Sequence, residues 1–339
     1  MAQLDTFGLP DFSMANMTAA INALPHKPKL LGQLNLFTPV PVNTGVVKVE
    51  KKEGKLALLV TAARGTIGNV RVQPQRIVRT FNLPHVPQYQ TIMADDIHGI
   101  RAFGSETELQ AVQNVVNDNL QGCRDNHEAT HEYHRIGAIK GTILDGDMST
   151  TIYNLYTEFG ESQTTVTFTD ATTEPKAFAD TIVRNTANAL GNDGFTEIVA
   201  LCSDDFFSNF TSDTGIRDTY LNSLSNMVLR QSQLGPEYGP YANGFEWGGI
   251  LWLNYRGTIG GTPYIASNEA YTFPRGVPGM FQEICGPGDS MQAVGTRGQL
   301  MYASQHILPH DAGVELKTTS DCLMLNNRPL ACQKLVWTT

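Results

Sequence analysis

The chain has 339 residues, of which 41% are apolar, enough to build hydrophobic cores in one large domain or in two to three ordinary ones. Only 17% of the residues are charged, and 24 basic against 33 acidic residues give a net charge of -9. This balance argues against direct DNA or RNA binding, because no excess of Lys and Arg is available to neutralise phosphates. A weakly charged surface rich in Thr, Asn and Gly suits contact with other protein.

The cysteines and the N-terminus bear on the cellular setting. Five cysteines form no C-x-x-C motif: Cys123, Cys202, Cys285, Cys322 and Cys332. Their odd number predicts reduced thiols, buried as small hydrophobic side chains, in a cytoplasmic protein. The N-terminus lacks a basic flank followed by an apolar segment, and no apolar run approaches the roughly 18 residues of a membrane span. We therefore expect a protein that stays soluble where it is made, without membrane contact.

The first predicted elements are a short helix and a β-rich segment. Apolar residues recur at helical spacing between Met14 and Leu24, after the candidate cap Ser13 and before two prolines. Residues 45–60 predict a hairpin with a charged turn, and a second β-rich pair follows at 69–83. An isolated hairpin is marginal in water, so we expect this segment to lie against something else, such as another chain.

A long helix is predicted next, from a capping box at Ser105 and Glu108 to about Ile136. At about 100° per residue its apolar positions fall on one face, and three histidines continue that face. The face consists of Leu109, Val112, Val116, Leu120, Cys123, His127, His131 and His134. We expect the histidines to extend a buried stripe.

The rest of the chain predicts a mixed α+β protein. Residues 142–159 indicate strands, and their acids Asp145 and Asp147 do not form a calcium loop, because Thr150 replaces the required Gly and Tyr156 the required Glu. A small α/β unit follows, with a helix between Pro175 and Gly191, a strand at 196–203 and a helix from Asp204. Strands and Gly-Pro turns continue from residue 245 to the C-terminus.

The segment HEATHEYH at 127–134 contains the zinc-peptidase signature H-E-x-x-H in His127, Glu128 and His131. A third ligand is needed. His134 lies about 10.5 Å from His127 along a straight helix, too far for one ion, and the later acids Glu158 and Glu161 fall in a predicted strand. We therefore assign no catalytic, cofactor-binding or metal-binding residues and no cofactor. A zinc metallopeptidase using residues 127–131 remains the alternative, and a tail or decoration protein is a third hypothesis.

Several motifs together resemble the lambda-type major capsid proteins of tailed bacteriophages, the phage capsid E family. They are ARG after a strand (63–65), MADDIHGIRAFG (93–104), FEWGGILWLNYRG (245–257), EAYTFPRGVPGMF (269–281) and TTSDCLMLNNRPLACQKLV (318–336). Each is weak alone, but their order and spacing cover about residues 35–339. The resemblance implies a Hong Kong 97-type capsid fold and a major capsid protein whose shell, icosahedral or prolate, encloses packaged double-stranded DNA.

The same resemblance implies a division of the chain. The N-terminal arm would be residues 1–33, the extended loop 34–90, the axial domain 166–289, and the peripheral domain 91–165 with 290–339. It also implies pentamers and hexamers of the chain itself, scaffolding and portal proteins, a decoration protein as a further partner, and assembly in the host cytoplasm into a virion. The DNA would be enclosed without sequence-specific binding. For the histidines we hypothesise that particle stability changes between about pH 5 and 7.

Overall fold

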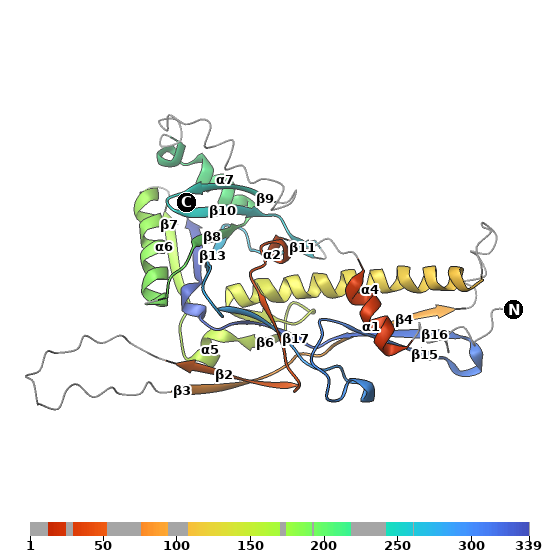
Figure 1. The fold of residues 1–339 in the computed structure, drawn as a ribbon. Coiled ribbons are helices and arrows are strands. Elements are labelled where there is room, and N and C mark those ends of the chain that lie inside the picture. The colour runs from red at the N-terminus through yellow and green to blue at the C-terminus, as the bar shows by residue number, and fades with distance from the viewer. Residues whose placement is uncertain are drawn as a thin grey trace, which may run out of the picture.

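The computed structural model describes residues 13–24, 30–52, 76–93, 108–169, 174–191, 193–217, 242–259 and 261–338. The fold is elongated along one long helix, α4 (Glu108–Lys140), with a large sheet at the C-terminal end of the helix and smaller sheets beside it (Figure 1). None of the helices in these ranges is long and apolar enough to cross a lipid bilayer.

The large sheet has six strands in the order β7-β18-β13-β8-β10-β9. They are β7 (Thr164–Thr169), β8 (Glu197–Cys202), β9 (Ala242–Trp247), β10 (Ile250–Tyr255), β13 (Glu269–Arg275) and β18 (Gln333–Thr338). Helices α6 (Pro175–Leu190) and α7 (Asp204–Ser212) cover one face with an aromatic cluster that includes Phe178, Phe210 and Trp252. The opposite face packs with Ile136 and Ile139 of α4 in a second cluster, which explains why β8 is apolar on both sides.

Two three-stranded sheets lie along α4. One has the order β15-β16-β4, from β4 (Val86–Met93), β15 (Tyr302–Ile307) and β16 (Gly313–Ser320). The other has the order β1-β14-β17, from β1 (Thr38–Pro41), β14 (Phe281–Cys285) and β17 (Cys322–Asn326). Helix α1 (Met14–Ala23) packs Met17 and Ile21 into a third cluster with Leu120 of α4 and Leu316 of β16.

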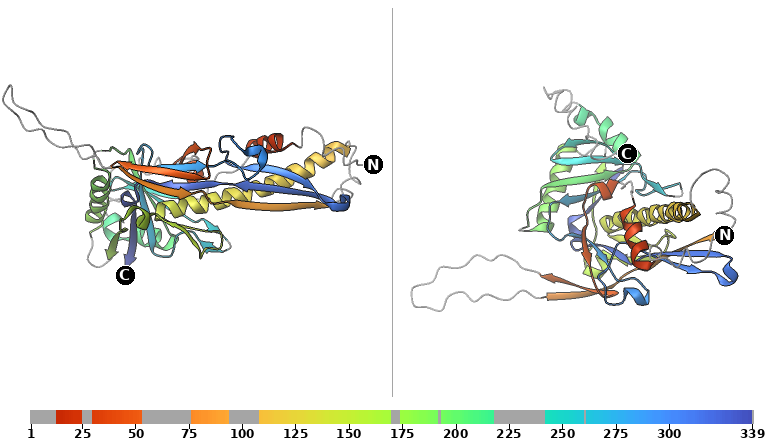
Figure 2. Two further views of the ribbon diagram at one scale, coloured as in Figure 1. Left: turned by 90° about the horizontal axis from the view of Figure 1, so that it is seen from below. Right: turned by 45° about the vertical axis from the view of Figure 1, so that its right-hand side comes forward.

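The remaining elements lie outside these three sheets and the four helices already described. They are α2 (Leu30–Gln33), β2 (Val46–Lys52), β3 (Arg76–Asn82), β5 (Thr142–Leu144), β6 (Thr151–Asn154), α5 (Leu155–Phe159), β11 (Thr258–Ile259), β12 (Thr262–Pro263), η5 (Met291–Ala293), η6 (Pro309–Asp311) and η7 (Pro329–Ala331). Strands β2 and β3 form an antiparallel ribbon that projects from the body (Figure 2).

Helices α1 and α4 largely confirm the sequence predictions. Ser13 caps α1, because its hydroxyl accepts a hydrogen bond from the backbone N–H of Asn16. The buried face of α4 continues from Val116 through His134, but the capping box at residue 105 lies outside the described ranges. The helix ends at Lys140, four residues later than predicted, where Gly141 takes a φ of +83°.

One local prediction was wrong, and the two predicted hairpins are tested only in part. Strand β2 pairs with β3, in the register Val49 to Arg79, so the ribbon joins the first arm of one predicted pair to the second arm of the other. The predicted strands at 56–60 and 69–74 lie outside the described residues. Residues Leu155–Phe159 form helix α5 rather than a strand, because Asn154 caps its start and Gly160 takes a left-handed conformation at its end.

The predicted division into domains stays a prediction. Strand β18 lies between β7 and β13 in the six-stranded sheet, although it belongs to the C-terminal range assigned to the peripheral domain. The C-terminal segment therefore contributes both to the sheets along α4, through β15, β16 and β17, and to the large sheet, through β18.

Candidate functional site

The two histidines of the H-E-x-x-H motif lie on the buried face of α4 and bind hydroxyl groups of β16. The Nε2 atom of His127 is 3.0 Å from Oγ1 of Thr318, and Nε2 of His131 is 2.7 Å from Oγ of Ser320. Both imidazoles are 2% exposed. The Nε2 nitrogens of both imidazoles are therefore engaged with the neighbouring sheet.

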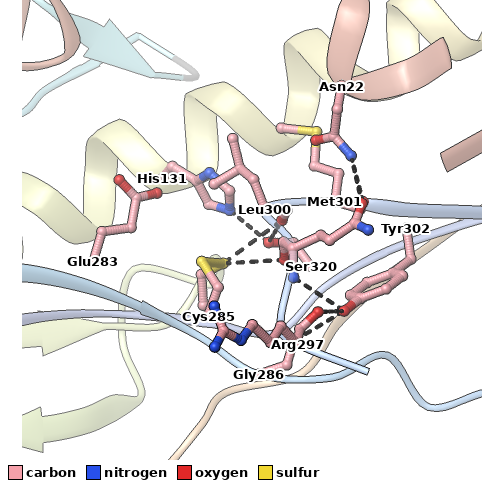
Figure 3. The surroundings of a disulfide bond; sticks show 12 residues. Asn22, His131, Glu283, Cys285, Gly286, Arg297, Leu300, Met301, Tyr302 and Ser320 are labelled. Carbon is pink, nitrogen blue, oxygen red and sulfur yellow. Dashed lines mark hydrogen bonds between the residues drawn. A yellow bond between two sulfur atoms is a disulfide. The ribbon is translucent and has the colours of Figure 1, made fainter. Parts of the chain in front are cut away.

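The hydrogen bonds around Ser320 define the tautomer of His131. The Ser320 hydroxyl donates to the carbonyl oxygen of Leu300 at 2.8 Å, so its oxygen accepts from Nε2–H of His131. Figure 3 shows this chain of groups from α4 to Leu300, which precedes β15. A neutral imidazole with its proton on Nε2 cannot bind a metal through that nitrogen, which supports a structural role for this residue.

The glutamate of the motif also has a partner, and the more distant glutamates considered as third ligands lie elsewhere. Glu128, the general base of a zinc peptidase, has its carboxylate 3.8 Å from the guanidinium of Arg135. Among the residues that the structure describes, neither Glu158 nor Glu161 joins the histidines in a cluster of donors spaced for one metal ion. The motif is present in sequence, but its geometry here is that of helix-to-sheet packing.

Two charged residues of α4 extend these contacts to other elements. Glu132 is fully buried and accepts hydrogen bonds from the backbone N–H of Leu31 at 2.9 Å and from the Tyr255 hydroxyl at 3.1 Å. Arg135 donates to both carboxylate oxygens of Glu283, at 3.3 and 3.4 Å. We call His127, His131, Glu132 and Arg135 the polar seam. It fixes α4 against β16, α2, β10 and β14.

Burial controls the titration of the polar seam. It lowers the pKa of His127 to about 4. It lowers the pKa of His131 well below its ordinary value, and the nearby positive charge of Arg135 lowers it further. Burial also lowers the pKa of His134, which is 1% exposed. Burial opposes the charge of Arg135, but three carboxylates, first that of Glu283, raise its pKa. The histidines are thus neutral and the arginine is charged at neutral pH.

The cysteines differ in part from the prediction of reduced thiols. That prediction is wrong for Cys285 and Cys322, which form a disulfide between β14 and β17 (Figure 3). The two residues face each other in the antiparallel register, with their Cα atoms 4.1 Å apart. No sequence signal reveals this, because the register joins residues 37 positions apart. Cys123, Cys202 and Cys332 are free and buried, as predicted.

One group of metal-ligand side chains lies at this disulfide. Donor atoms of Glu283, Cys285 and Cys322 are within 4.8 Å of one another, and all three residues are buried. The sulfurs are joined to each other and the carboxylate is paired with Arg135, so both charge and valence are satisfied without an ion. No motif in the sequence marks this cluster, because Cys322 is 37 residues beyond Cys285.

Comparison with known proteins identifies the class. The sequence profile of the family described as phage major capsid protein E matches residues 13–336, so the chain belongs to that family. The fold, with its long helix, ribbon and two groups of sheets, is the Hong Kong 97-type capsid fold. The protein is a structural capsid subunit of a phage and not an enzyme.

Individual relatives agree with the family. The chain is 25% identical over 330 residues to the major capsid protein of Pseudomonas phage KPP10, covering 92% of this chain and 93% of that protein. It is 23% identical over 349 residues to the major capsid protein of Salmonella phage Felix O1, covering 94% of each. The crystal structure of a prophage protein of E. coli CFT073, assigned as a capsid protein, superposes with a TM-score of 0.60 at 12% identity, covering 96% of this chain and 99% of that one.

Proposed function

We propose that copies of this chain assemble into pentamers and hexamers that close a phage head around packaged double-stranded DNA. The working division is the one predicted from sequence: an arm at 1–33, an extended loop at 34–90, a peripheral domain at 91–165 and 290–339, and an axial domain at 166–289. Rings of five and six require head-to-tail contacts between different surfaces of the same chain. Many modest contacts of this kind add up to a stable shell.

The β2–β3 ribbon carries the proposal. It projects from the body, and its exposed apolar side chains include Val46, 44% exposed, and Val78, 50% exposed. At its root Phe81 is fully buried in the second hydrophobic cluster, the one that contains Ile136 and Ile139 of α4. The ribbon is therefore anchored in its own subunit and extends away from it. A neighbouring subunit is the surface that would cover the two valines.

The charge of the chain favours a genome that is enclosed by the shell and not bound by it. With a net charge of -9, the chain as a whole has no excess of Lys and Arg to retain nucleic acid. We include scaffolding and portal proteins, and a decoration protein, among the partners, with assembly in the host cytoplasm. These partners follow from the resemblance to lambda-type capsid proteins.

Electron microscopy of the purified protein tests the assembly. The chain is produced with and without the assembly factors of its own phage, negatively stained, and analysed in parallel by sedimentation. Shells, tubes, or rings of five and six subunits are expected. A lasting monodisperse monomer in both preparations would contradict the proposal. Boiled, denatured particles should give one band at 37.1 kDa, whereas a ladder would indicate covalently joined subunits.

A pair of variants at one position tests the ribbon. Val78→Asp places a charge on the exposed apolar surface of β3, whereas Val78→Thr keeps a β-branched side chain of similar size. Both variants should fold, because the position is half exposed. Only the aspartate variant should fail to form shells. Equal assembly of the two variants would show that this surface of the ribbon is not part of the interface between subunits.

A further inference from the structure

The Cys285–Cys322 disulfide lies where several segments meet. Strand β1 runs parallel to β14 and places Pro41 beside Cys285, and the next residue, Val42, donates its N–H to the Cys285 carbonyl oxygen at 2.8 Å. Gly286, directly after the disulfide, donates its N–H to the Asp321 carbonyl oxygen at 2.9 Å. The bond therefore lies at the point where β1 leads into the β2–β3 ribbon.

The surroundings of the two sulfurs can also accommodate the reduced form, in which both cysteines are thiols. The Cys322 sulfur is 3.6 Å from the carbonyl oxygen of Leu300, a position in which a thiol S–H could donate a hydrogen bond. Strands β14 and β17 pair over their whole length, from Phe281 with Asn326 to the two cysteines. Their apolar side chains lie in the second hydrophobic cluster, with Ile136 and Ile139. Because this ladder and core do not depend on the sulfur bond, the fold can form before the bond does.

The other three cysteines lie apart from this pair. Cys123 is on α4, Cys202 is on β8 and Cys332 precedes β18, and all three are buried and free. Burial raises the pKa of each of these thiols, and none of the three is bonded to a second cysteine, unlike Cys285 and Cys322. Oxidation of the folded chain therefore has one intramolecular product.

We propose that the Cys285–Cys322 bond closes after folding and assembly, so that intracellular subunits carry the dithiol and released particles carry the disulfide. This proposal rests on the proposed function, because it requires assembly inside a reducing cell. Two S–H bonds break and one S–S bond forms. The two electrons and two protons pass to dissolved oxygen, which is reduced to hydrogen peroxide. Oxygen is small enough to reach sulfurs in residues that are only 6% and 2% exposed.

The closed bond would stabilise the particle. It joins residues 37 apart and so encloses β15 and β16 in a covalent loop. Such a loop lowers the conformational entropy of the unfolded chain and so stabilises the folded one. For a loop of this length the expected rise in melting temperature is roughly 5 to 10 °C. The ribbon root would be held more firmly in the particle than in the newly made subunit.

Thiol counting tests the proposal on the wild-type chain. Producing cells and purified particles are quenched in acid, denatured with a chelator, and treated with a maleimide polymer that adds mass for each thiol. The chelator releases any thiol bound to metal, so a lost thiol reports oxidation alone. Of the five cysteines, all should react in the cell sample and only the three free ones in particles. Three reactive thiols already in cells, or five in particles, would overturn the proposal.

Two further measurements connect the bond to stability. A permeant phosphine reductant should lower the melting temperature of wild-type particles by roughly 5 to 10 °C and leave Cys285→Ser particles unchanged. Cys123→Ser, the matched control, should keep both the loss of two thiols and the response to reductant. An unchanged wild-type melting temperature would refute the stabilising effect. Shells with five thiols would contradict only this proposal, whereas absence of shells would contradict the proposed function.

Discussion

Replacing His127 by glutamine is expected to make the fold less sensitive to acid. The imidazole is 2% exposed, and burial lowers its pKa from 6.5 to about 4. Its partner is the Thr318 hydroxyl, 3.0 Å from Nε2. A glutamine amide can still donate to that oxygen, but it does not titrate in this range. The variant therefore removes a proton-binding group while keeping a polar partner for β16.

The direction and size of the effect follow from the two pKa values. Between pH 6.5 and pH 4 the unfolded chain binds a proton on this imidazole and the folded chain does not, so the free energy of unfolding falls as the pH falls. The loss is absent above the unfolded pKa and complete below the folded one. It amounts to roughly 3 kcal/mol in total, most of which is lost by about pH 4.5.

Urea unfolding of the unassembled subunit, followed by tryptophan fluorescence at about pH 7.5 and about pH 4.5, measures this difference. On acidification the His127→Gln variant should lose roughly 2 to 3 kcal/mol less than the wild type. It should keep some acid sensitivity, because His131 and His134 remain. His306→Gln, at an exposed position on β15, is the control and should behave as the wild type. Equal losses in His127→Gln and wild type would refute the reasoning.

Three further changes test the aromatic cluster, the C-terminal end of α4 and the ion pair of the polar seam. Phe210→Ala removes a fully buried ring from the aromatic cluster and should cost about 3 to 5 kcal/mol by urea unfolding; a cost below about 1 kcal/mol would contradict the packing. Gly141→Ala adds a Cβ that would lie 2.1 Å from the Tyr156 ring at a positive φ, and should lower the melting temperature and soluble yield; wild-type values would show that the turn differs. Glu283→Gln leaves buried Arg135 without its nearest carboxylate and should cost about 3 kcal/mol; no change in the urea midpoint would mean that the remaining carboxylates suffice.

Local signals predicted the helices well. Ser13 and the following apolar spacing identified α1, and the pair Pro175 and Gly191 identified the bounds of α6. These signals work because capping and helix termination depend on residues within one turn. The same kind of signal was available for α5, where Asn154 and Gly160 mark both ends, but five residues between them give too short a pattern to separate helix from strand.

Long-range pairing could not be predicted in the same way. The partner of β2 is β3, about 30 residues beyond it, and an alternating pattern does not say which of several strands it will meet. The hydroxyl partners of His127 and His131 lie 191 and 189 residues away along the chain. The sequence indicated that the histidines belong to a buried face, but only the fold supplies Thr318 and Ser320.

The geometry of that face explains why a zinc-peptidase motif occurs in a capsid protein. Residues i and i+4 of a helix are separated by about 6.0 Å along its axis, and residues i and i+2 of a strand by about 6.8 Å. Histidines at 127 and 131 on α4 therefore match hydroxyls at 318 and 320 on the inward face of β16. A peptidase uses the same helical spacing to bring two imidazoles to one ion. Here the spacing directs each imidazole to its own hydroxyl, and this fixes the helix against the sheet.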